Sequence, residues 1–140
     1  MKNNAQDTRH GLRQRALQAI VSLDYGQDPI QAAQFAYLYD KEVEGEVEIP
    51  IFLLSLVTGV SQHLPELDAE LSQHLKAGWT LERLTSIDKG ILRLGLYEAK
   101  YENETPARVA VNEAIELAKE FSDETAAKFI NGVLTRYITD

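Results

Sequence analysis

The 140-residue chain has the length of one domain, or of two small bundles packed together. It contains no cysteine, which excludes disulfides, thiolate zinc sites and cysteine nucleophiles. Its first residues lack the apolar core of a secretory signal, and its longest apolar stretch, residues 49–60, is too short to span a bilayer. We therefore expect a soluble, cytoplasmic protein without a membrane partner.

Charge is distributed unevenly along the chain. The net charge of −8 argues against a nucleic-acid ligand. Residues 1–15, however, hold four basic residues against Asp7 alone, a local charge of +3, whereas the remainder carries −11. Because phosphate binding depends on local potential more than on net charge, the basic N-terminus is either a phosphate-binding surface or simply a solvated chain end.

Proline, glycine and capping residues divide the chain into helical segments. Asp7 and Thr8 are candidate N-caps of a helix that runs to about residue 24, and Pro29 begins a second helix. Residues 40–48 alternate valine and glutamate as a half-buried strand would. The sequence offers no second strand for pairing, so we expect an acidic, solvated linker there.

The rest of the chain predicts five more helices and one short turn. Their expected ranges are 50–63, 65–75, 81–84 for the turn, 86–102, 106–121 and 122–137. Apolar residues cover most of the circumference of 86–102, which is therefore expected to be the central helix. Glycine inside a helix costs about 1 kcal/mol relative to alanine, so we expect Gly90, Gly95 and Gly132 to permit close approach of neighbouring helices.

Few residues are arranged for catalysis. His10, His63 and His74 lie far apart without i, i+4 pairing, so no metal site is expected. No glycine-rich phosphate loop follows a strand, and no serine has the context of a nucleophile elbow. The carboxylates fall where solvated helix surfaces place them. The pattern predicts an all-α helical bundle that binds partners, without enzymatic activity or a cofactor.

Four segments carry a family resemblance. Residues 88–98 (DKGILRLGLYE), 109–121 (VAVNEAIELAKEF) and 128–134 (KFINGVL) resemble, in order and spacing, three motifs of the NusB family of transcription antitermination factors. Those motifs read D-x-x-I-L-R-x-A-x-Y-E, V-A-I-N-E-A-V-E-L-A-K-x-F and K-F-V-N-G-V-L. Residues 9–20 (RHGLRQRALQAI) are similar to the family's opening R-R-x-A-R-E-x-A-L-Q-A-L. The chain also has the length of the whole family domain.

The resemblance implies both a fold and a function. One NusB-like domain of about seven helices would comprise two packed subdomains, residues 1–76 and 77–140. NusB proteins pair with NusE, a ribosomal small-subunit protein that doubles as a transcription factor. The pair binds the single-stranded boxA element of nascent RNA and nucleates an antitermination complex on RNA polymerase, notably during ribosomal RNA synthesis.

The expected RNA contacts combine cations, which hold phosphates, with an aromatic face that stacks on bases. Arg9 and Arg13 are four residues apart and can share one side of a helix, whereas Arg15 lies well around it. Phe129 comes from the matched C-terminal motif, and core packing is its alternative role. The resemblance gives the RNA-binding set as Lys2, Arg9, His10, Arg13, Arg15 and Phe129.

The resemblance places the NusE surface around the break before the central helix and at that helix's start. Here that means Glu82 and Asp88, with Val21 on the first helix as a further candidate. Acidic side chains that face a basic ribosomal protein would be electrostatically complementary. Either carboxylate could equally stabilise a helix N-terminus.

The chain also departs from the family pattern. Gly11 and Leu12 interrupt the basic cluster, and Gln14 stands where glutamate is usual. With only three or four phosphates neutralised, RNA binding should be weak, salt-dependent and dependent on NusE. Two alternatives stay open. One is a substrate-docking domain of the kind that RNA cytosine methyltransferases carry, and the other is a protein-interaction or homodimeric module that does not bind RNA itself.

Overall fold

The computed structural model describes residues 7–138, which form seven α-helices and two short 3-10 helices without a strand. The all-α prediction is therefore confirmed. The chain divides into two compact units, Met1–Gln62 and His63–Asp140. This division precedes the position near residue 76 that the sequence suggested, because the helix after His63 packs within the second unit.

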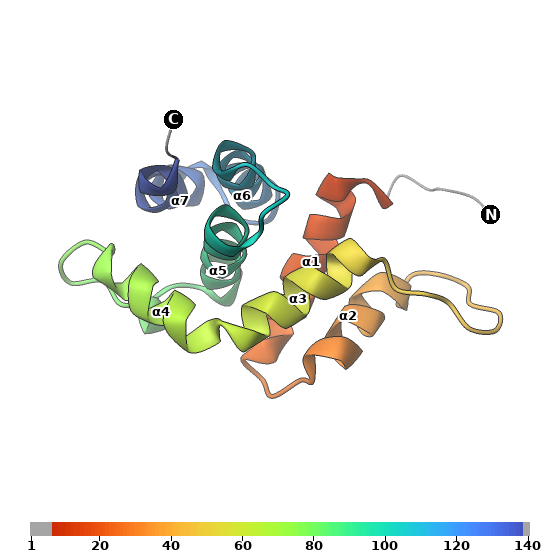
Figure 1. Cartoon of the computed structure of the whole chain (residues 1–140). Helices are drawn as coiled ribbons and strands as arrows, with labels where there is room; N and C mark the ends of the chain where they lie inside the picture. Colours follow the sequence, from red (N-terminus) through yellow and green to blue (C-terminus); the bar gives the residue numbers. More distant parts are fainter. Residues whose placement is uncertain (1–6, 139–140) are drawn as a thin grey trace. The chain divides into compact units, whose positions relative to one another are not determined.

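The first unit is a three-helix bundle (Figure 1), in which each helix packs against the other two. Its helices are α1 (Arg9–Leu23), α2 (Pro29–Leu38) and α3 (Ile51–Gln62). Thr8 caps α1, since its side-chain oxygen accepts a hydrogen bond from the Gly11 N–H at 3.0 Å. Asp28 caps α2 in the same way, and Pro29 occupies the first turn. The predicted starts of both helices are thus confirmed.

The acidic segment 40–48 connects α2 to α3 through turns and bends and forms no strand. Its glutamates are exposed, and Gly45 adopts a φ of 74°, which glycine tolerates without steric cost. The alternation of valine and glutamate is therefore not a strand signal here, because no partner strand exists to pair with it.

The second unit is built around one central helix. Its elements are α4 (Leu64–Gln73), η2 (Leu81–Arg83), α5 (Ser86–Tyr101), α6 (Ala107–Phe121), α7 (Glu124–Leu134) and η3 (Thr135–Tyr137). Helix α5 packs against α4, α6 and α7, and its side chains from Ile91 to Leu96 are buried. This confirms the predicted central helix. Thr85 and Asp123 cap α5 and α7 through their side chains.

A buried ion pair fixes α4 against α5. The Arg93 guanidinium is buried and donates from Nε and Nη2 to the two carboxylate oxygens of Asp68, each at 2.8 Å. A buried arginine requires such a bidentate partner, because an unpaired charge in a protein interior is strongly destabilising. The pair explains why α4 belongs to the second unit although the sequence placed it in the first.

Two helical glycines of the second unit have opposite surroundings. A Cβ on Gly95 would lie 2.7 Å from Leu134 Cδ1 and 3.0 Å from Ala114 Cβ, so the close helix approach expected there is confirmed. A Cβ on Gly132 would meet nothing within 4 Å. The close packing expected at Gly132 was therefore wrong: this glycine lies on the exposed side of α7.

The different surroundings of Gly95 and Gly132 predict that replacing each by alanine changes the free energy of unfolding in opposite directions. Gly95→Ala should destabilise the protein by about 1–3 kcal/mol, because buried Leu134 and Ala114 must move to admit the methyl group. Gly132→Ala should stabilise it by up to about 1 kcal/mol, through helix propensity alone. Urea denaturation followed by circular dichroism measures both. Equal effects of the two substitutions would contradict the packing described here.

Candidate nucleic-acid interface

In the first unit, two of the predicted cations share an aromatic partner. The guanidinium carbons of Arg9 and Arg13 lie 4.0 and 5.2 Å from the ring centroid of Phe52 on α3. Their common side of α1, expected from the four-residue spacing, is thus observed. Arg9 is exposed, whereas only 5% of Arg13 is exposed. The ring orients Arg9 by a cation–π contact and leaves this arginine accessible to a phosphate.

His10 lies half-buried next to Arg9 at the start of α1, and Val21 is half-buried near the end of the same helix. Lys2 lies outside the described residues. The accessible cationic surface that the structure describes at this helix therefore centres on Arg9 and His10.

Arg15 holds two helices together. It is 6% exposed, and its Nη1 and Nη2 atoms donate to Asp40 at 3.0 and 2.9 Å, while Nη1 also donates to the Ala36 carbonyl at 3.0 Å. Its guanidinium also lies 5.4 Å from the Tyr39 ring centroid. This arrangement engages the guanidinium with the C-terminal end of α2, so Arg15 is a structural residue in this geometry and is not displayed for RNA.

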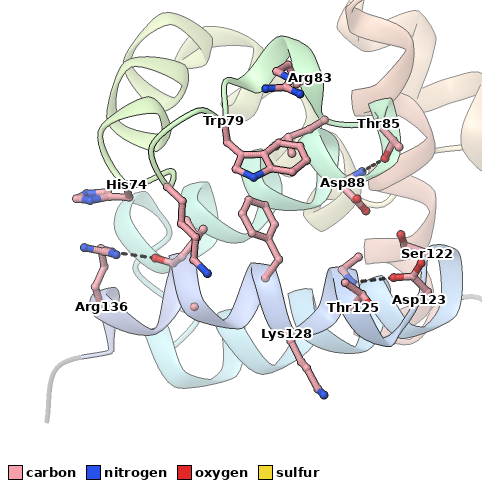
Figure 2. A pocket seen from close by; sticks show the side chains of 16 residues that line it. His74, Trp79, Arg83, Thr85, Asp88, Ser122, Asp123, Thr125, Lys128 and Arg136 are labelled. Carbon is pink, nitrogen blue, oxygen red and sulfur yellow. Dashed lines mark hydrogen bonds between the residues drawn. The ribbon is translucent and has the colours of Figure 1, made fainter.

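The second unit contains a groove of about 740 Å³ between the α4–α5 connection and α7 (Figure 2). Four cations and two carboxylates line it: Lys76, Arg83, Lys128, Arg136, Asp88 and Asp123. Two aromatic side chains, Trp79 and Phe129, also line it. The lining thus combines two aromatic rings with basic and acidic side chains, although the whole chain is acidic.

Trp79 is the most accessible aromatic group of this groove, with 47% of its surface exposed. In Figure 2 its indole projects over α7, whereas Lys128 extends to the other side of that helix. The Arg83 guanidinium lies 5.1 Å from the indole centroid and donates to the Gly78 carbonyl at 2.6 Å. The cation therefore holds the ring in place, and about half of the tryptophan surface remains exposed to solvent.

The predicted Phe129 and Asp88 line this same groove. Phe129 is half-buried, so it contributes to packing and also presents part of its ring. Asp88 lies in the first turn of α5, where its N–H donates to Thr85 Oγ1 at 3.1 Å. Its Oδ1 atom is buried without a hydrogen-bond partner among the described residues. Glu82 is exposed on η2, outside the groove lining.

Phe52 and Trp79 are not among the site residues predicted from the sequence. Phe52 is one apolar residue in a strongly apolar helix, so nothing in its pattern distinguishes it. Trp79 did carry a signal: it is the chain's single tryptophan, and it lies in a loop close to Lys76 and Arg83. An aromatic loop residue between cations is a typical feature of single-stranded nucleic-acid binding.

No metal site or membrane helix is found in the described part of the chain. Among residues 7–138, no group of three or more histidine, aspartate or glutamate side chains could hold a metal ion. No helix there is long and apolar enough to cross a membrane.

Comparison with known proteins identifies the family. A model of the NusB family matches residues 10–139. The chain belongs to the NusB family. Its fold is similar to T. maritima NusB, with a TM-score of 0.80 and 27% identity over 98% of this chain and 92% of that one. NusB from Aquifex aeolicus is similar at a TM-score of 0.71 and 26% identity, over 93% and 88%.

A third similar structure contains partners. A chain in the crystal structure of antitermination factors NusB and NusE in complex with dsRNA matches with a TM-score of 0.78 and 25% identity. The match covers 92% of this chain and 94% of that one. The NusB fold therefore extends over nearly the whole sequence.

The Arg15–Asp40 pair predicts a pH-dependent contribution to stability. The hydrogen bonds from Arg15 lower the pKa of the Asp40 carboxyl, so the pair stabilises the folded state above the unfolded pKa of about 3.9. That stabilisation is lost as the pH falls through the lower folded pKa. Asp40→Asn should therefore lower the urea midpoint at pH 7, and the difference from the wild type should shrink near pH 3.

Glu42→Gln is the matched control, because Glu42 is exposed in the same connection. It should leave the midpoint at pH 7 unchanged. An equal fall for both variants would show that the overall charge of the connection matters and that the Arg15 pair does not.

Proposed function

We propose that this protein is a transcription antitermination factor that binds single-stranded boxA RNA together with NusE and supports processive transcription of ribosomal RNA operons. Its membership of the NusB family supports this role. A similar NusB has been crystallised with NusE and double-stranded RNA, which supports both partners. Within the cell, the complex would act on RNA polymerase in the cytoplasm.

The preference for single-stranded RNA rests on the groove that holds Trp79 and Phe129. The bases of an RNA duplex are stacked on one another, and its wide minor groove mainly presents hydroxyl groups and base edges. Accessible ring faces beside cations instead suit unstacked bases, which lie on the rings while the cations contact the phosphates. The exposure of Trp79 beside Arg83 is the observation that carries this proposal.

The N-terminal surface would supply the phosphate contacts. Arg9, His10 and Lys2 are the proposed contacts, with Arg13 supporting Arg9 through their common partner Phe52. Because Arg15 is engaged by Asp40, fewer cations are available than the sequence suggests. Few phosphate contacts give weak and salt-sensitive binding, which favours dependence on NusE.

NusE would contact Asp88 and Glu82, with Val21 as a further contact. Asp88 lines the groove, and its Oδ1 atom accepts no hydrogen bond from residues 7–138, so its carboxylate is not neutralised within that part of the chain by a donor to this oxygen. Glu82 is exposed and so would act mainly on the rate of encounter.

A protein-interaction or homodimeric module without RNA binding is the alternative function. The net charge of −8 and the burial of Arg13 and Arg15 favour it. The two functions differ in a direct measurement of RNA binding.

The single tryptophan makes that measurement specific to the groove. Adding boxA RNA should quench the Trp79 fluorescence, because a base stacks on the indole. By anisotropy of labelled RNA with NusE present, Trp79→Ala should weaken binding by about 5- to 150-fold, corresponding to about 1–3 kcal/mol per stacked base. Phe129→Ala and Arg9→Gln should also weaken binding, and Arg9→Gln should reduce its salt dependence.

Tyr25→Ala is the control, since Tyr25 is an exposed aromatic residue of the first unit and does not line this groove. It should leave RNA affinity unchanged. RNA binding that stays absent with the wild type at low salt, with and without NusE, would instead support the protein-interaction module.

Asp88 and Glu82 should affect NusE binding in different ways. Asp88→Asn should raise the Kd for NusE by about tenfold or more, mainly through faster dissociation, because it removes a desolvated charge. Glu82→Gln should mainly slow association and reduce the salt dependence. Surface plasmon resonance separates the two rates. Glu116→Gln on α6 is the control. If it weakened NusE binding as much as Asp88→Asn does, a specific contact at Asp88 would be contradicted.

A further inference from the structure

The first unit carries a second groove, of about 470 Å³, that the proposed function does not use. It lies between α1 and α2. The buried residues Ala19, Ala32 and Ala36 form its base, and the exposed rings of Phe35 and Tyr39 form its edge. The small alanine side chains at the base and the large rings at the edge leave room in the groove for one aliphatic side chain.

The two rings at this edge are exposed to an unusual degree for paired aromatic side chains. Phe35 is 69% exposed and Tyr39 is 53% exposed, and their rings stack with centroids 5.7 Å apart and an interplanar angle of 19°. Arg15, held by Asp40, contacts Tyr39 and so fixes one ring of the pair. An ordered aromatic pair that is open to solvent beside a groove is typical of an interaction surface.

The charge around this groove is mainly negative. Residues 15–62 contain two basic residues, Arg15 and Lys41, and seven acidic ones: Asp24, Asp28, Asp40, Glu42, Glu44, Glu46 and Glu48. Both cations pair with Asp40, so they do not neutralise the other six carboxylates. Asp24 and Asp28 lie where α1 ends and α2 begins, and the other five follow the opposite end of α2. Both ends of the groove are therefore acidic, which disfavours a nucleic acid or an anionic lipid surface and favours a cationic ligand.

We propose that the groove between α1 and α2 docks a basic segment of a partner protein. One aliphatic side chain of that segment would occupy the alanine base. Its arginine or lysine side chains would lie over the Phe35 and Tyr39 rings and reach toward the glutamates of residues 42–48. The lining of this groove does not include the proposed NusE contacts Glu82, Asp88 and Val21, and docking there would not depend on RNA binding.

The test uses the full-length protein and a fluorescein-labelled 12-residue peptide that carries alternating arginines around a central leucine. A peptide with glutamate in place of arginine is the charge control. Anisotropy at two salt concentrations should show salt-sensitive binding of the basic peptide only. Phe35→Ser should weaken binding of the basic peptide about fivefold or more, as expected for loss of an aromatic anchor, while Tyr25→Ser should leave this binding unchanged.

Charge at the groove is tested with a second matched pair. Gln18 lines the groove and is exposed, whereas Gln34 is exposed on α2 outside the lining. Gln18→Arg should weaken binding of the basic peptide more than Gln34→Arg does, because the new charge at the groove repels the peptide. The double variant Glu42→Gln/Glu44→Gln should weaken binding and reduce its salt dependence more than Glu116→Gln/Glu120→Gln on α6.

Three outcomes would overturn the proposal. The first is equal weakening by the groove and control variants, which would show that the peptide follows net charge alone. The second is displacement of the peptide by NusE, which would assign the groove to the NusE surface. The third is a homodimer, detected by sedimentation, that Phe35→Ser dissociates, which would show that a second copy covers the groove. The Phe35→Ser variant should still bind RNA and NusE. A failure of peptide docking can then be distinguished from a failure of the proposed function.

Discussion

A buried arginine whose charge must be matched by a carboxylate from another segment of the chain organises each unit of this protein. Arg15 joins α1 to the end of α2 through Asp40, and Arg93 joins α5 to α4 through Asp68. Removing one partner would leave a charge in a poorly solvated position, so each pair fixes the position of one helix against another. The Arg15 pair has two further consequences. It withdraws a cation from the basic N-terminus, and it fixes Tyr39 at the edge of the acidic groove.

Local features of the chain could be predicted from the sequence because their causes are local. Thr8 caps α1 and Pro29 occupies the first turn of α2, as predicted from short-range rules, and the apolar circumference of residues 86–102 identified the central helix. Arg15 could not be assigned in this way, because its partner is 25 residues away and is one of many acidic residues near the start of the linker. Gly95 and Gly132 look alike in sequence, and only the neighbouring helices distinguish them.

The candidate site was predicted in part for the same reason. Phe129 and Asp88 came from motif resemblance and line one groove, but their proposed roles stay predictions. Trp79 lies in the break between α4 and η2, where helical periodicity does not indicate the role of a side chain. Lys76 and Arg83 of the α4–α5 connection and Arg136, which follows α7, bring basic side chains from two segments to the lining of one groove. A chain with a net charge of −8 can therefore present a surface suited to phosphate, while its first unit presents one suited to a basic partner.

The proposed dependence of RNA binding on NusE, which follows from the limited number of accessible cations, is a coupling between two binding equilibria. If NusE strengthens RNA binding by some factor, RNA must strengthen NusE binding by the same factor. Asp88, proposed for NusE, and Phe129, proposed for RNA, line a single groove within one unit, so a short physical connection between the two ligands exists. A protein that bound RNA strongly by itself would be retained on any RNA. With Arg15 engaged within the fold, the proposed weak intrinsic RNA affinity would make assembly depend on both partners being present, which is the behaviour expected of a factor that must respond to a particular transcript.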